Sequence, residues 1–253
     1  MLQPEAWARP GMLSKSISRA RTAVALGTVL LLAASCSALP WHNEPVSDEV
    51  NVVFVVERNL LYVPSVTIDN RAGRFFFSTA APRTVLDPRF MSRTAGGHSI
   101  ELNERESLRM SPVALDLGTA GDAMIGADVW GRRAITVDYH AGLLSYQKAG
   151  IFPGLMTLYN FTGQPKVDVM VNGREISAIV DTASPETLEL PAAKRGRGTA
   201  HIVIAGSDLG EVDVAFSPGL TQPRIGNRLL AHFLLSIDYG RRVVGLWRDP
   251  RIR

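Results

Sequence analysis

The 253-residue sequence predicts an all-β protein built from two copies of one lobe. Short segments with alternating apolar residues and many β-branched side chains recur between turn signals such as "NG", "TAGG" and "GSDLG". Two blocks of sequence occur twice, in the same order. The best helix candidates, "GADVWGRRA" (126–134) and "GNRLLAHFL" (226–234), are short and occupy corresponding places in the two copies. Short strands with few short helices are typical of a barrel or a sandwich.

The repeat is visible without any gap in the alignment. Residues 66–85 match residues 169–188 at an offset of 103, with six of twenty positions identical. Residues 125–139 match residues 225–239 at an offset of 100, with Ile-Gly at one end and Asp-Tyr at the other. Two blocks in the same order, at nearly the same offset, indicate a duplicated lobe rather than chance.

These matches divide the chain. We expect lobe one at 51–150 and lobe two at 166–248, with a short tail at 249–253. Residues 151–165, in the stretch "GIFPGLMTLYNFTGQP", are rich in Gly, Pro and Asn and predict a linker.

The first 36 residues have the features of an export signal. Basic residues precede a largely apolar run at 23–34, and small residues and Cys36 follow it. The segment "LAASC" resembles the lipobox of bacterial lipoproteins, in which the cysteine is lipidated and becomes the new N-terminus. The resemblance implies a lipid on Cys36, and plain cleavage after Ala38 is the alternative. Translation from Met1 and from Met12 both remain open.

Cys36 is the only cysteine, so it cannot form an internal disulfide, which favours lipidation. Ser37 follows it, and by resemblance to lipoproteins this favours the outer membrane, on the periplasmic side. A soluble periplasmic protein is the alternative. Residues 37–50, which include "PWHNEPVSDE", predict a tether.

The charge balance argues against a nucleic-acid partner. The first 36 residues hold four of the 27 basic residues and one of the 24 acidic residues. The remaining chain therefore has 23 of each, and it lacks the basic surplus of a nucleic-acid-binding domain.

The repeated blocks resemble aspartic peptidases of the pepsin and retropepsin type. In that family an apolar strand leads into Asp-Thr-Gly-Ala/Ser, and a hydrophobic-hydrophobic-Gly element opens a short helix later. Copy two has "IVDTASPET" and "RIGNRLL", with Gly226 45 residues after Asp181. Copy one has "FFSTAAPRT" and "MIGADVW", with Gly126 48 residues after Ser78. The resemblance covers about 200 residues and implies two homologous retropepsin-like β-barrel lobes arranged as a pepsin-like pseudo-dimer.

The two copies differ at the residue that carries the chemistry. In the family, one Asp from each lobe meets the other, and the two carboxyl groups share one proton. One group activates water and the other donates its proton to the scissile carbonyl. Here copy two supplies Asp181, whereas copy one supplies Ser78. A hydroxyl does not exchange protons near neutral pH, so the resemblance implies an incomplete catalytic pair.

The supporting positions of the motif are kept in both copies. The resemblance implies that the threonines link the two loops across the lobe interface and that the later glycines let the backbone pass close to these loops. Alanine stands where the family has glycine within the motif. These positions are Thr79, Thr182, Gly126, Gly226, Ala80 and Ala183.

Two functions follow. The first is a degenerate peptidase whose cleft between the lobes binds an extended peptide or a segment of unfolded protein. The alternative is an active aspartic endopeptidase that uses Asp181, with a second acid from a dimer partner or from elsewhere. The sequence leaves enzymatic activity and the oligomeric state open.

No metal or other cofactor is expected. The five histidines show no spacing typical of metal sites. Asp138 and Asp238 recur before Tyr and are interpreted as turn or strand-end residues. By resemblance, "RTAGGH" (93–98) and "KRGRGTAH" (194–201) are candidates for flaps over the cleft.

Overall fold

The computed structural model describes residues 49–91, 97–103, 106–131, 133–148 and 154–248. The predicted signal, the lipidation site Cys36, the tail and all but the end of the tether lie outside these residues, as do 93–96 of the first flap candidate. No helix within the described ranges has the length and apolar character needed to cross a membrane.

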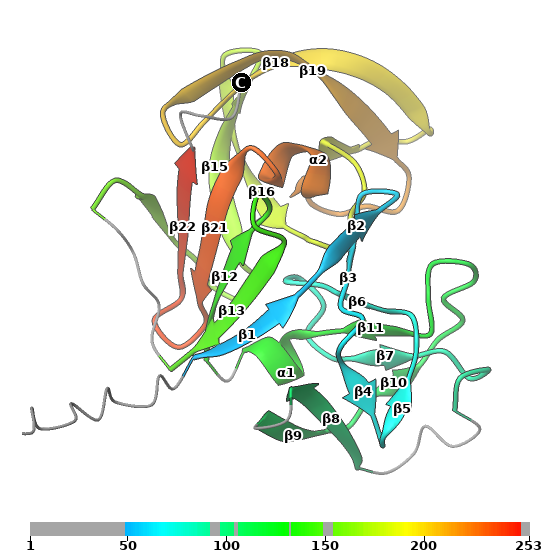
Figure 1. Cartoon of the computed structure of the whole chain (residues 1–253). Helices are drawn as coiled ribbons and strands as arrows, with labels where there is room; N and C mark the ends of the chain where they lie inside the picture. Colours follow the sequence, from blue (N-terminus) through cyan, green and yellow to red (C-terminus); the bar gives the residue numbers. More distant parts are fainter. Residues whose placement is uncertain (1–48, 92–96, 104–105, 132, 149–153, 249–253) are drawn as a thin grey trace, which may run out of the picture. The chain divides into compact units, whose positions relative to one another are not determined.

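Strands dominate the described chain, and Figure 1 shows most of them with their labels. The central sheet has the order β1-β13-β12-β21-β22-β14, and its strands are β1 (Val50–Val53), β13 (Leu143–Gln147), β12 (Ala134–Asp138), β21 (Phe233–Asp238), β22 (Val243–Arg248) and β14 (Thr157–Asn160). Copy two forms a closed barrel of β15 (Lys166–Val171), β16 (Arg174–Val180), β20 (Arg224–Ile225), β17 (Leu188–Pro191), β19 (Ser207–Ser217) and β18 (Gly196–Ile204).

Copy one forms two smaller sheets. One has the order β10 (Val113–Ala114), β7 (Val85–Leu86), β11 (Ala123–Ile125), β6 (Phe75–Phe77), β3 (Leu60–Tyr62) and β2 (Val55–Glu57). The other has the order β5 (Arg71–Ala72), β4 (Thr67–Ile68), β8 (His98–Asn103) and β9 (Glu106–Met110). The short helices α1 (Ala127–Trp130) and α2 (Asn227–Leu230) lie within the two segments expected to be helical. The predicted all-β, two-lobed fold is confirmed.

The central sheet joins the two copies about a local twofold axis. Strands β12 and β21 pair antiparallel, with Thr136 opposite Ser236. These two residues are equivalent in the repeat, at an offset of 100, and their hydroxyl oxygens lie 3.2 Å apart. Only a residue on a twofold axis can face its own equivalent. The duplicated lobes are therefore related like the subunits of a symmetric dimer.

The strands of copy one are less continuous than those of copy two. Strand β16 runs without interruption, whereas the corresponding part of copy one is split at Gly73 into β5 and β6. A Cβ at Gly73 would lie 2.4 Å from the ring of Phe75 and 2.8 Å from that of Phe90, and these rings pack edge to face. These rings therefore occupy the space of a side chain at position 73, at the point where the strand is interrupted. Copy one forms two sheets where copy two closes a barrel.

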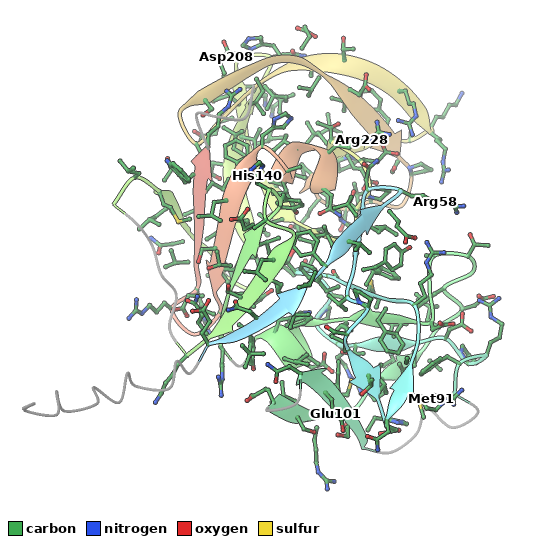
Figure 2. All side chains as sticks on the ribbon, in the orientation of Figure 1. Arg58, Met91, Glu101, His140, Asp208 and Arg228 are labelled. Carbon is green, nitrogen blue, oxygen red and sulfur yellow. The ribbon has the colours of Figure 1, made fainter. Side chains whose placement is uncertain are left out.

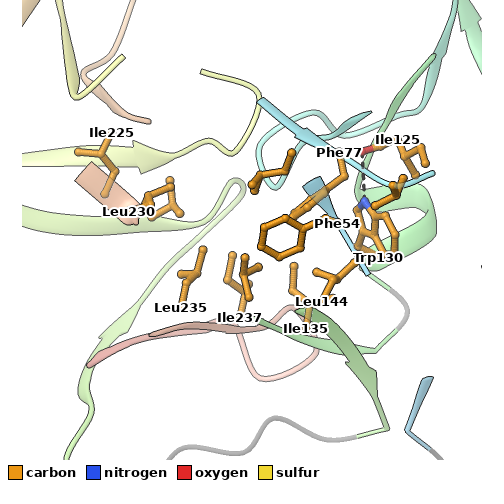
Figure 3. Packing of buried hydrophobic residues seen from close by; sticks show 14 of the residues in the cluster. Phe54, Phe77, Ile125, Trp130, Ile135, Leu144, Ile225, Leu230, Leu235 and Ile237 are labelled. Carbon is orange, nitrogen blue, oxygen red and sulfur yellow. Dashed lines mark hydrogen bonds between the residues drawn. The ribbon is translucent and has the colours of Figure 1, made fainter. Parts of the chain in front are cut away.

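One hydrophobic core runs through both copies. Ile135, Leu144, Leu235 and Ile237 of the central sheet are fully buried, and they share a cluster with side chains of both lobes. Figure 3 shows Trp130 of α1 in this cluster, with its indole nitrogen donating to the carbonyl of Ile125. The two lobes therefore pack as one body within the described residues.

The segment predicted to be a linker contains a short strand. Residues 157–160 form β14, which pairs antiparallel with β22 at the edge of the central sheet. Leu158 is 54% exposed, so the strand is stabilised by its backbone hydrogen bonds and not by burial of this side chain. Composition predicted a connection because the Gly and Pro residues flank a strand too short to produce a clear alternation.

Acid should weaken the structure through Asp87, a buried carboxylate in copy one. Its oxygens accept hydrogen bonds from the backbone and guanidinium of Arg89 and from the backbone of Leu117, at 2.7–2.9 Å. The Arg89 hydrogen bonds hold the pKa of Asp87 well below its ordinary value. A lowered folded-state pKa stabilises the protein above the unfolded-state pKa, about 4, and this contribution is lost as pH falls below it.

We therefore expect Asp87→Asn to be less stable than the wild type at pH 7, with a difference that shrinks between pH 5 and pH 3. Urea unfolding at each pH measures this. The control is Asp213→Asn, because the Asp213 side chain is 69% exposed. Parallel stability curves for wild type and Asp87→Asn would contradict the assignment.

Candidate active site

Ser78 and Asp181 occupy equivalent ends of equivalent strands. Ser78 follows β6 and its backbone N–H donates to the carbonyl of Ile125, whereas Asp181 follows β16 and donates to that of Ile225. The Ser78 hydroxyl donates to Asp181 Oδ1 at 2.8 Å. Both residues are buried, with 1% and 4% of their surface exposed. The structure thus brings together the two residues that the repeat aligned.

Thr79 and Thr182 make reciprocal hydrogen bonds across the two loops. The Thr79 hydroxyl donates to the carbonyl of Val180 at 2.6 Å and accepts from the Thr182 N–H at 3.2 Å. The Thr182 hydroxyl donates to the carbonyl of Phe77 at 2.9 Å and accepts from the Thr79 N–H at 3.1 Å. Both side chains are fully buried. These four bonds fix one loop against the other.

The carboxylate of Asp181 is surrounded by donors. Oδ1 accepts from the Ser78 hydroxyl and from the Ala183 N–H at 2.9 Å. Oδ2 forms an ion pair with Arg224, whose Nη1 lies 3.1 Å away. The Ser78 oxygen in turn accepts from the N–H groups of Ala80 and Ala81 at 3.2 and 3.0 Å. Both oxygens of the Asp181 carboxylate therefore have a partner.

Arg224 is a site residue that the sequence analysis missed. It lies on β20 and pairs with Ile179 of β16, two residues before Asp181. In copy one the same register places Met124 of β11 opposite Phe76 of β6. The available signal was the alignment of "RIG" over "MIG", in which a cation replaces an apolar residue on the strand beside the active loop.

Two partly buried tyrosines support the loops through hydrogen bonds. Tyr239 donates to the carbonyl of Thr79 at 3.0 Å. Tyr139 donates to Asn227 Oδ1 at 2.8 Å, and the Asn227 amide donates to the carbonyl of Thr182 at 2.6 Å. Burial, and secondarily the charge of Asp181, raise the pKa of both tyrosines, so they remain neutral donors. The repeat aligns these two tyrosines, and no role was predicted for them.

The hairpin β2–β3 also reaches this network. The Asn227 amide donates to the carbonyl of Asn59, which lies in the turn after Arg58. Figure 2 shows Arg58 at the end of this hairpin and Arg228 on α2. The turn of copy one therefore contacts the helix that supports the active loop of copy two.

Gly126 and Gly226, which occupy equivalent positions in the two copies, lie where the backbone passes close to an active loop. A Cβ at Gly126 would lie 2.5 Å from the backbone of Arg83, and one at Gly226 would lie 2.4 Å from the carbonyl of Glu186. Ala80 is buried, whereas Ala183 is partly exposed. Side chains larger than hydrogen do not fit at either glycine unless the loop moves.

The remaining sequence hypotheses fall outside the site. Asp138 Oδ1 accepts from the N–H groups of His140 and Ala141, and Asp238 Oδ1 accepts from that of Arg241, as turn residues do. Residues 196–201 form the first part of β18, whereas the tip of its hairpin with β19 is at 205–206. Across the described ranges, His, Cys, Asp and Glu form no group of three or more that could hold a metal ion.

Comparison with solved structures identifies the fold. The crystal structure of an aspartic proteinase from Irpex lacteus superposes with a TM-score of 0.56 and 11% sequence identity, covering 80% of this chain and 98% of that chain. No protein-family model and no curated protein matches the sequence. At this identity the likeness establishes a pepsin-like aspartic proteinase fold and leaves the activity to the residues of the site.

Proposed function

We propose that this protein is a catalytically silent, peptide-binding protein with the pepsin-like fold, lipid-anchored at Cys36 on the periplasmic side of the bacterial outer membrane. The observation that carries the proposal is the buried contact between Ser78 and Asp181, 2.8 Å long. A second carboxyl group would be needed at position 78 to share a proton with Asp181 and to donate it to the scissile carbonyl.

Loss of that group removes one half of the acid–base chemistry. General acid or base assistance by one group is worth roughly 10²–10⁴ in rate. Asp181 also accepts hydrogen bonds from Ser78 and Ala183 and forms an ion pair with Arg224. Neither feature suits a carboxylate that must exchange a proton with water during each turnover.

An active homodimer is the less favourable alternative. It would have to bring a second Asp181 to the place where Ser78 now lies. That place is held by the four hydrogen bonds that Thr79 and Thr182 make across the two loops and by the central sheet, so the face is already occupied by copy one.

An apolar cluster beside the active loops supports the binding of peptide side chains. Its buried members are Leu60, Tyr62 and Phe76, and its partly exposed members are Leu117, Ala120, Met124 and Ala183. It combines residues of copy one with Ala183 of the second active loop. Partly exposed apolar side chains of this kind accept a side chain from an extended ligand.

Backbone pairing supplies the second element of peptide binding. Strand β2 lies at the edge of its sheet, and Val55 and Val56 on it are 43% and 51% exposed. An edge strand offers unpaired N–H and C=O groups to an extended peptide. β2 and the cluster are linked through β3, which carries Leu60 and Tyr62.

The test combines cleavage with binding. We expect the purified protein to leave reduced, carboxymethylated lactalbumin intact from pH 3 to pH 7. Its cleavage rate should equal the background rate measured with Asp181→Asn. We also expect both proteins to bind that unfolded chain, and Met124→Asp to bind it at least tenfold more weakly. Leu158→Asp, on the exposed edge strand β14, is the matched control. Cleavage that disappears in Asp181→Asn would establish a working peptidase, and absence of binding would refute the peptide-binding role.

The anchor has its own test. Growth with radiolabelled palmitate should label the wild type in the outer-membrane fraction and leave Cys36→Ser unlabelled. Labelling that persists in Cys36→Ser, or a wild type recovered only in the soluble periplasmic fraction, would contradict the lipid anchor.

A further inference from the structure

Arg224 and Met124 occupy the same place in the two copies but have opposite character. Each lies on a short strand, β20 or β11, that runs parallel to the strand leading into an active loop. Met124 packs in the apolar cluster with Leu60, Tyr62 and Phe76. Arg224 instead directs its guanidinium to Asp181 Oδ2 at 3.1 Å. Met124 therefore shows which uncharged residue the same position accepts in copy one, and it serves as a reference for Arg224.

The arginine is held at an energetic cost. Its side chain is 32% exposed, yet its Nε is buried without a hydrogen-bond partner in the described part of the chain. A buried unpaired donor is unfavourable. The contact that offsets this cost is the ion pair with Asp181, whose side chain is 6% exposed.

The positive charge of Arg224 affects how a second carboxyl group at position 78 could work with Asp181. Two neighbouring carboxyl groups share a proton because both cannot ionise side by side. An ion pair with a guanidinium, here at 3.1 Å, engages one of the two groups, so that group is not available to share a proton. The guanidinium also occupies the Asp181 oxygen that Ser78 and Ala183 leave free.

We propose that Arg224 is a positioning residue that blocks peptidase chemistry independently of Ser78, by holding Asp181 as the permanent partner of an ion pair. This inference rests on the proposed function, in which the wild type is silent. Restoring the missing acid with Ser78→Asp is then insufficient. Activity requires Ser78→Asp together with Arg224→Met, which installs the residue found at the equivalent place in copy one.

The chemistry available to the double variant is a balanced hydrolysis. The oxygen of a water molecule bonds to the scissile carbonyl carbon while Asp181 accepts a proton of that water. The carboxyl group introduced at position 78 gives its proton to the carbonyl oxygen. The C–N bond then breaks as the departing nitrogen takes the proton held by Asp181 and one hydroxyl of the intermediate returns its proton to the carboxylate at position 78. This leaves one acid, one amine and both carboxyl groups in their starting states.

The experiment compares five proteins at pH 3–7 with an internally quenched peptide library as substrate. We expect the wild type, Ser78→Asp and Arg224→Met to stay at background, and Ser78→Asp/Arg224→Met to exceed background at least 100-fold. Ser78→Asp/Arg224→Lys should return to background, because lysine keeps the positive charge. A peptide with a secondary hydroxyl in place of the scissile carbonyl should inhibit the double variant.

The outcomes separate the two proposals. Activity in Ser78→Asp equal to that of the double variant, or a folded but inactive double variant, would overturn the role of Arg224 and leave the proposed function intact. Activity in the wild type would overturn the proposed function instead. Circular dichroism and a melting curve for each variant establish that inactivity is not loss of folding.

Discussion

Thr182→Val should lower the free energy of unfolding by about 3 kcal/mol, a loss that comes from two buried groups left without partners. Valine has nearly the shape of threonine, so packing changes little. The Thr79 N–H loses its acceptor at 3.1 Å, and the carbonyl of Phe77 loses its donor at 2.9 Å. Each buried group without a partner costs about 1–3 kcal/mol. For a chain of this size the melting temperature should fall by roughly 10 °C.

Urea unfolding measures this loss, with Thr199→Val on the exposed part of β18 as the control. The double variant Thr79→Val/Thr182→Val should cost less than the sum of the single changes, because the two side chains share hydrogen bonds. A Thr182→Val variant as stable as Thr199→Val, or strictly additive costs, would mean that the reciprocal bonds contribute little to joining the lobes.

Gly226→Ala should destabilise the protein by about 3 kcal/mol for a steric reason. The added Cβ would lie 2.4 Å from the carbonyl oxygen of Glu186 and 2.5 Å from that of Ser184. Both obstacles are backbone atoms, so no side chain can rotate away. The glycine φ of −116° is open to any residue, and the cost is therefore contact and not conformation. The loop after Asp181 must move, together with α2.

The matched control is Gly97→Ala, because a Cβ at Gly97 meets nothing within 4 Å. Denaturant unfolding of both variants gives the comparison, and Gly126→Ala in copy one should behave like Gly226→Ala. If Gly226→Ala unfolds at the same denaturant concentration as Gly97→Ala, the close approach of the backbone is not a constraint on the fold.

The duplication made most of the fold predictable. Ser78 and Asp181 could be placed opposite each other because the offset of 103 aligned them, and Thr79 and Thr182 followed from the same alignment. Arg224 could not be placed, since its role depends on strand register, which pairs it with Ile179 beside the active loop. Periodicity in the sequence does not reveal which strands become neighbours.

Local sequence also hid two features of the architecture. Strand β14 lies in a segment rich in turn residues, and its pairing with β22 is a long-range contact that composition does not reveal. The ring of Phe90, 17 positions along the chain, leaves no room for a side chain at Gly73, where the strand is interrupted. Both depend on tertiary packing, which overrides local preference.

The central sheet contains both β1 and β22, the strands nearest the two ends of the described chain. A polypeptide that crosses a membrane with its N-terminus leading delivers β1, β13 and β12 well before β21 is available. During that interval the edge of β12 that will receive β21 is an open template for pairing with other chains. Under the proposed export, maturation therefore calls for a holding chaperone, or for rapid translocation, until the last strand has emerged.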